Sequence, residues 1–74
     1  MAKKVVDRSK LSERHHQIME LIMQGYADKE IAQQLGLSYH TVKGHISHLY
    51  DRLGAVDRAH AVAIYLGKAE PRRR

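Results

Sequence analysis

The sequence predicts an all-α domain of four short helices and no strands. Apolar residues recur every three or four positions over most of the chain, as one face of a helix requires. Ser and Asp, which often cap helices, and Gly, which often ends them, stand between these apolar stretches. The 74 residues include no Phe or Trp and only four Tyr, so aromatic runs typical of strands are scarce. This length fits one domain with a modest core.

The first half of the chain predicts two helices. The first is expected to follow the cap Ser12 and to end near Gln24, just before Gly25. Its buried stripe comprises Ile18, Leu21 and Ile22, with Leu11 closing over the start and Met19 or Met23 filling gaps. Asp28 is expected to cap the second helix, which ends at Gly36. The inward residues of this second helix are Ile31, Ala32 and Leu35.

The second half predicts two more helices. Ser38 is expected to cap a helix over 39–53, which Gly54 ends. Its buried stripe comprises Val42, Ile46, Leu49 and Leu53. Asp57 is expected to cap a fourth helix over 58–67, after which the tail should fray. The inward or partner-facing positions of this helix are Ala61, Val62, Tyr65 and Leu66.

The domain organisation follows from this pattern and from charge. We expect a flexible basic arm at 1–10, a folded domain at 11–67 and a basic tail at 68–74. Each end holds four Lys or Arg against one acidic residue, whereas residues 11–67 hold five against six. The formal net charge of +5 therefore comes from the two ends. A basic end is as often a solubilising segment as a phosphate contact, so net charge alone does not establish nucleic-acid binding.

The most informative spacing lies between the second and third helices. Counting from Asp28, the fifth residue is Ala32, the ninth is Gly36 and the fifteenth is Val42. A helix-turn-helix needs a small residue where its helices cross, a glycine in the turn and an apolar residue on the second helix. The three coincidences together predict a helix-turn-helix from Asp28 to about Leu53.

The outward face of the third helix is the candidate binding surface. Opposite its buried stripe lie His40, Gly44, Ser47 and Asp51, with Lys43 on one flank and Thr41, His48 and Arg52 on the other. In a helix that lies in the major groove, the N-terminal part of this face approaches base edges. We therefore predict base contacts from His40, Lys43, Gly44 and Ser47. Gly44 makes the helix less stable than Ala would at this position. Either a close approach of the helix backbone to DNA or neutral drift explains why a glycine stands there.

Backbone and partner contacts complete this hypothesis. Phosphate contacts are predicted for Lys29, Ser38, Thr41, His48 and Arg58. Small or apolar residues on the fourth helix, Ala59, Ala63 and Leu66, are the predicted dimer interface. One short helix buries little area, so we expect a homodimer that is weak without DNA.

Other function classes find little support in the sequence. The six histidines include the close pairs His15/His16 and His45/His48, but no further ligands are evident, so no metal is expected. No nucleophile stands beside a suitable base, and the absence of Cys rules out a thiol, so we expect no enzyme and no cofactor. No apolar run has the length of a membrane span and no secretory signal opens the chain, so the expected location is the cytoplasm.

The stretch from Leu11 to Leu66 resembles the LuxR-type (GerE-type) helix-turn-helix of bacterial transcription regulators. Its most specific marks are KEIA, TVKGHI and LYDRLG, followed by Arg58 and Ala61-Val62. The resemblance implies a four-helix domain that binds double-stranded DNA as a dimer, with the third helix in the major groove and the fourth in the dimer contact. It also implies a link, in a longer chain, to a receiver or ligand-binding domain, although standalone members exist.

By position, the family's base contacts fall on Lys43, Gly44 and Ser47, and its backbone contacts fall near Lys29, Ser38, Thr41 and Arg58. The sequence also departs from the family. His15 stands where an acidic residue usually completes a capping box, and Ala27 stands where a Ser or Thr cap is common. Family members usually carry a larger residue at the position of Gly44. The resemblance therefore does not indicate which DNA sequence this chain binds.

Two alternatives remain beside a sequence-specific transcription regulator. One is a sigma-factor-like promoter-recognition domain, which would bind as a monomer. The other is a protein-interaction adaptor that uses the same helical fold without DNA, which the slightly acidic centre permits. Steep weakening of duplex binding with salt would separate the DNA-binding proteins from the adaptor.

Overall fold

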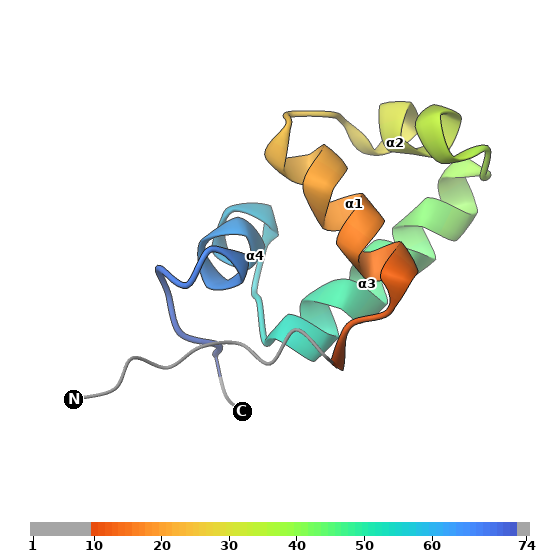
Figure 1. Cartoon of the computed structure of the whole chain (residues 1–74). Coiled ribbons are helices and arrows are strands. Elements are labelled where there is room, and N and C mark those ends of the chain that lie inside the picture. Colours follow the sequence, from red (N-terminus) through yellow and green to blue (C-terminus); the bar gives the residue numbers. More distant parts are fainter. Residues whose placement is uncertain (1–9, 73–74) are drawn as a thin grey trace.

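The computed structural model describes residues 10–72, and these form four helices without a strand. The helices are α1 (Glu13–Met23), α2 (Asp28–Leu35), α3 (Tyr39–Leu53) and α4 (Arg58–Tyr65). The longest helix, α3, packs against each of the other three. Figure 1 shows α1 crossing α3, α2 at the N-terminal end of α3, and α4 on the other side of the bundle. The predicted fold class is confirmed, whereas nearly all of the predicted arm at 1–10 lies outside the described residues.

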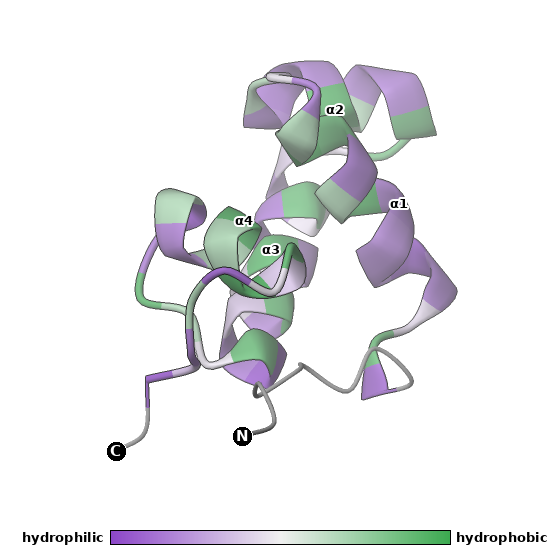
Figure 2. Ribbon diagram, turned by 60° about the vertical axis from the view of Figure 1, so that its left-hand side comes forward, coloured by the Kyte–Doolittle hydropathy of each residue, from purple (hydrophilic) through white to green (hydrophobic). Residues whose placement is uncertain are grey.

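The core forms where the apolar stripes of the four helices meet. All four residues of the predicted α3 stripe are buried, and Ile18, Ile22, Ile31 and Ala32 join them from α1 and α2. Figure 2 shows hydrophobic segments of α3 and α4 lying side by side. Two core residues were not singled out by the periodicity: Met19, predicted only as a gap filler, and Ile64 are each no more than 1% exposed. Leu66, one of the predicted inward or partner-facing residues, is 51% exposed and so lies outside the core.

The start of α1 is capped by a serine and a histidine. The backbone N–H of His15 donates to Ser12 Oγ at 3.1 Å, and the backbone N–H of Ser12 donates to His15 Nδ1 at 3.2 Å. These are the two reciprocal bonds of a capping box, with an imidazole nitrogen in place of the usual carboxylate oxygen. The box lacks its usual carboxylate, as the sequence indicates, and the His15 ring closes it instead.

The start of α2 differs from the sequence prediction in a similar way. Ala27 occupies the N-cap position and Asp28 is the first helical residue, so the prediction that Asp28 caps this helix is wrong. The Ala27 N–H donates instead to Glu30 Oε1 at 2.7 Å. The Asp28 carboxylate is thereby left for contacts with other elements.

The C-terminal part of the chain is more ordered than the composition suggested. Helix α4 ends at Tyr65, two residues before the predicted end. Residues 68–72 then fold back, and the Arg72 N–H donates to the Gly54 carbonyl at 2.7 Å. His60 holds the segment further, because its Nε2 lies 2.9 Å from the Glu70 carbonyl oxygen while its Nδ1 accepts from the Val56 N–H at 3.1 Å. The expected fraying directly after Gly67 is therefore wrong as far as Arg72.

Candidate nucleic-acid interface

The α2–α3 corner has the geometry that a helix-turn-helix needs. Gly36 ends α2 in the left-handed conformation, with φ 69°, which favours glycine. The Leu37 N–H then donates to the Ala32 carbonyl at 2.9 Å and closes the turn. Ala32 and Val42 are 5% and 0% exposed, so both lie in the contact between the helices. The predicted small and apolar positions are thus buried, and the predicted glycine lies in the turn between α2 and α3.

The first turn of α3 is held by a serine–threonine pair. Ser38 Oγ accepts from the Thr41 N–H at 3.0 Å and caps the helix. The Ser38 hydroxyl donates in turn to Thr41 Oγ1 at 2.9 Å. Because Thr41 Oγ1 acts as the acceptor of this bond, the Thr41 hydroxyl hydrogen can be directed outward to a phosphate oxygen.

The outward face of α3 is accessible along its length. The four predicted base-contacting residues are all exposed: His40, Lys43, Gly44 and Ser47. Of the residues predicted to contact the DNA backbone, Lys29, Ser38, Thr41 and His48 are also exposed. Apart from the neighbouring residues and the local α3 backbone, no atom lies within 4 Å of a Cβ built on Gly44, so this part of α3 is open to a ligand. Lys29 lies on α2, Ser38 is the N-cap of α3, and the others lie on α3.

Lys43 is the lysine at the edge of this outward face, and its ammonium group has two neighbours. Its Nζ lies 3.9 Å from Asp28 Oδ2 and 5.8 Å from the centre of the Tyr39 ring. Tyr39 is 46% exposed at the start of α3 and was not among the predicted site residues. The periodicity of apolar residues could not identify Tyr39 as a site residue, because its ring lies outside the buried stripe. Its exposed ring beside Lys43 is the feature that marks it.

Arg58 is engaged inside the domain. Its Nη1 donates to Asp28 Oδ1 at 2.9 Å, and its Nη2 donates to the Tyr26 carbonyl oxygen. Burial raises the pKa of the Tyr50 phenol nearby, while the charge of Arg58 and a hydrogen bond from it act in the opposite direction. The guanidinium therefore joins the starts of α2 and α4 beside α3. A phosphate contact from its remaining exposed surface stays a prediction.

The histidines do not assemble into a metal centre. Among residues 10–72, no three His, Asp or Glu side chains come together as metal ligands would. His15 is buried, and burial lowers its pKa, with the positive charge of Arg52 acting in the same direction. His16 Nδ1 lies 2.8 Å from the Tyr65 hydroxyl, a contact that connects α1 with α4.

The residues predicted to form a dimer interface lie along α4. Ala59 and Leu66 are exposed and Ala63 is half-buried, so the end of this helix presents apolar surface to solvent. Their spacing of four and three residues places them on one side of the helix. Whether a second copy covers this surface stays a prediction.

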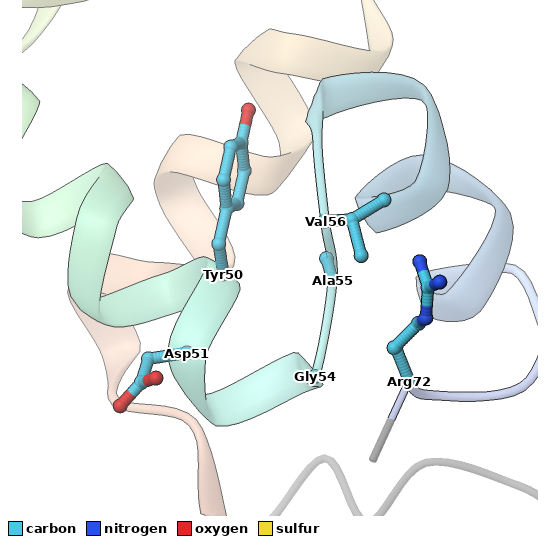
Figure 3. A pocket seen from close by; sticks show the side chains of 6 residues that line it. All are labelled: Tyr50, Asp51, Gly54, Ala55, Val56 and Arg72. Atoms are coloured by element: carbon cyan, nitrogen blue, oxygen red, sulfur yellow. The ribbon is translucent and has the colours of Figure 1, made fainter. Parts of the chain in front are cut away.

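A shallow groove lies at the other end of α3, away from the outward face of its first turns. It is lined by Tyr50, Asp51, Gly54, Ala55, Val56 and Arg72. Figure 3 shows Tyr50 and Asp51 pointing in different directions while Arg72 extends toward Val56. The polar groups of this groove do not converge on one point.

None of the helices among the described residues combines the length and hydropathy that crossing a membrane requires.

Comparison with known proteins agrees with this geometry. The family model of bacterial regulatory proteins of the luxR family matches residues 9–65. Among curated proteins, the chain is 38% identical over 56 residues to the probable transcriptional regulatory protein SgaR of Hyphomicrobium methylovorum. That match covers 76% of this chain and 26% of the relative, so the chain spans about a quarter of the relative's length. Because the family model matches most of its residues, the chain belongs to the luxR family of bacterial regulatory proteins, and α2 and α3 form a helix-turn-helix.

Proposed function

We propose that this domain binds specific sequences of double-stranded DNA and regulates transcription in the cytoplasm, with α3 in the major groove. The observation that carries the proposal is the exposed polar face of α3, which the turn at Gly36 directs away from the core. Lys43 can donate to the O6 and N7 acceptors of guanine, and His40 and Ser47 can donate or accept hydrogen bonds. The open space at Gly44 allows the helix backbone to approach the bases.

The DNA backbone is contacted on both sides of this face in the proposed complex. Lys29 at the start of α2 and the hydroxyl of Thr41 would bind phosphate oxygens, which fix the position of α3 in the groove. His48 follows about two turns further along α3. Ser38 contributes chiefly through Thr41, because its own hydroxyl is directed to that side chain.

The proposed assembly is a homodimer through α4, with Ala59, Ala63 and Leu66 in the contact. Two copies related by a two-fold axis would bind two half-sites about one helical turn apart. A helix of eight residues buries little area, so dimerisation should be weak until DNA or a linked receiver or ligand-binding domain adds to it. A strictly monomeric complex would instead favour the sigma-factor-like alternative.

The experiment starts from selection of duplexes that the protein binds out of a random pool. The Lys43→Ala variant is then compared with wild type on the selected site and on a random duplex of equal length. Loss of a base contact should weaken binding to the selected site by about 10-fold to 100-fold, and weaken binding to the random duplex far less. Lys29→Ala is the matched control, because a phosphate contact should weaken both duplexes equally.

Two results would contradict the proposal. Equal weakening of both duplexes by Lys43→Ala would reduce Lys43 to a phosphate contact. Absence of duplex binding by wild type even at low salt would favour the adaptor, because binding that releases counterions must strengthen as salt falls.

A further inference from the structure

The Asp28 carboxylate lies between two cations that come from different helices. Its Oδ1 accepts from Arg58 Nη1 at 2.9 Å, and its Oδ2 lies 3.9 Å from Lys43 Nζ. The Asp28 side chain is only 21% exposed, whereas those of Lys43 and Arg58 are 55% and 40% exposed. One carboxylate at the start of α2 therefore faces both the outward face of α3 and the start of α4.

The two ion pairs differ in how firmly they are held. Arg58 also donates to the Tyr26 carbonyl oxygen, so its planar guanidinium is fixed at two points. Lys43 has a longer contact with Asp28 and a loose contact with the Tyr39 ring. The ammonium group can therefore move, while Arg58 keeps the carboxylate in place beside it.

This arrangement affects two kinds of DNA acceptor differently. A phosphate is anionic, so it must compete with Asp28 for Lys43 and is itself repelled by the carboxylate. A guanine edge is neutral, and an ammonium group has three hydrogens, so Lys43 can donate to O6 or N7 while still facing Asp28. The carboxylate thus penalises phosphate contacts of Lys43 more than base contacts.

We propose that Asp28 is a positioning residue that determines specificity, because it restrains Lys43 from binding phosphates and so weakens binding to non-cognate DNA. The proposal rests on the proposed function, in which Lys43 contacts bases. Asp28 itself contacts neither base nor phosphate and acts through Lys43.

The test compares Asp28→Asn with Asp51→Asn on the selected site and on a random duplex, over a series of salt concentrations. The amide of Asn keeps an oxygen that can accept from Arg58, and thermal unfolding verifies that the fold is retained. Asp51 is the matched control, because it is exposed on α3 and the same charge is removed there without an ion pair to Lys43.

Asp28→Asn should tighten random-duplex binding by about 3-fold to 10-fold, and the plot of log affinity against log salt should steepen by about 0.9, one phosphate contact. Binding to the selected site should change less, so the ratio of the two affinities falls. Asp51→Asn should change both affinities by the same factor and leave the salt slope unchanged.

Two further variants show whether the effect passes through Lys43. In a Lys43→Gln background, Asp28→Asn should no longer tighten random-duplex binding beyond Asp51→Asn. Lys43→Gln alone, which leaves the start of α2 intact, should not change the random-duplex salt slope. A slope shallower by about 0.9 would mean that Lys43 already neutralises a phosphate, and would overturn the proposal.

The remaining outcomes separate this proposal from the one on which it rests. If wild type binds duplexes but Asp28→Asn behaves like Asp51→Asn, the role of Asp28 is refuted and the proposed function stands. If the effect of Asp28→Asn persists without Lys43, the role of Asp28 is refuted in the same way. If wild type binds no duplex at low salt, both proposals fall.

Discussion

Acid should destabilise this domain through His15. The Nδ1 atom of its ring accepts from the Ser12 N–H, so it must carry a lone pair. Protonation of Nδ1 would place two donors opposite each other at the start of α1. Burial and the charge of Arg52 lower the pKa of His15 in the folded state, so the unfolded chain binds the proton more readily. Stability should therefore fall as the pH drops below the unfolded value of 6.5.

The magnitude follows from what protonation removes. One backbone-to-ring hydrogen bond of 3.2 Å is lost, and such a bond contributes about 0.5–1.5 kcal/mol to stability. Ser12 is exposed, so water can satisfy its freed N–H. We therefore expect a loss of about 1 kcal/mol in the free energy of unfolding. For a domain of this size, that lowers Tm by about 4–8 °C.

The measurement compares wild type with His15→Gln by urea unfolding at about pH 7.5 and about pH 5.5, on either side of the usual histidine pKa. Gln can accept from the Ser12 N–H as a capping box requires, and it stays neutral at both pH values. The other five histidines are present in both proteins, so the comparison reports on His15. Wild type should lose about 1 kcal/mol more than the variant on acidification. An equal loss in the two proteins would refute this role of His15.

Two glycine substitutions test other parts of the structure. Gly54→Ala should cost clearly more than about 1 kcal/mol, because φ is +73° and the new Cβ would lie 2.7 Å from the Pro71 Cβ. Gly36→Ala is the control, because φ is +69° there but the space around the new Cβ is open. In urea unfolding it should lower the free energy of unfolding by about 1 kcal/mol. Equal losses for the two variants would mean that the Pro71 segment moves aside freely. Gly44→Ala should stabilise α3 by about 1 kcal/mol. The same variant should weaken binding to the selected DNA site, and unchanged affinity would show that the α3 backbone does not approach DNA at Gly44.

Local signals in the sequence predicted most of the helix boundaries. The bounds of α3 follow from Ser38, which caps it, and from Gly54, which ends it in the left-handed conformation. Its stripe of apolar residues is buried as the spacing indicates. The outward positions of His40 and Ser47 follow from the same helical period, because a side opposite a buried stripe must face solvent in a bundle this small.

Contacts between distant residues could not be predicted in this way. Asp28 and Arg58 are thirty residues apart, and neither belongs to a periodic pattern, so nothing local indicates that they pair. The fold-back of residues 68–72 depends on His60 and Gly54, which are polar or small and lie outside the apolar stripes. The role of His15 is not indicated by the usual capping-box pattern, which has Glu or Gln at this position, although a neutral imidazole offers an equivalent acceptor.

These distant contacts also determine how the domain can bind DNA. Arg52 donates to the Lys10 carbonyl at 2.8 Å, Arg58 donates to the Tyr26 carbonyl, and Lys43 faces Asp28. Cations that are engaged with their own domain contribute less to phosphate binding, and residues 11–67 already hold one more acidic than basic side chain. A single copy should therefore bind random DNA weakly and with a shallow salt dependence. In the proposed dimer, affinity then comes from doubling the base contacts of α3, which favours correctly spaced half-sites over DNA in general.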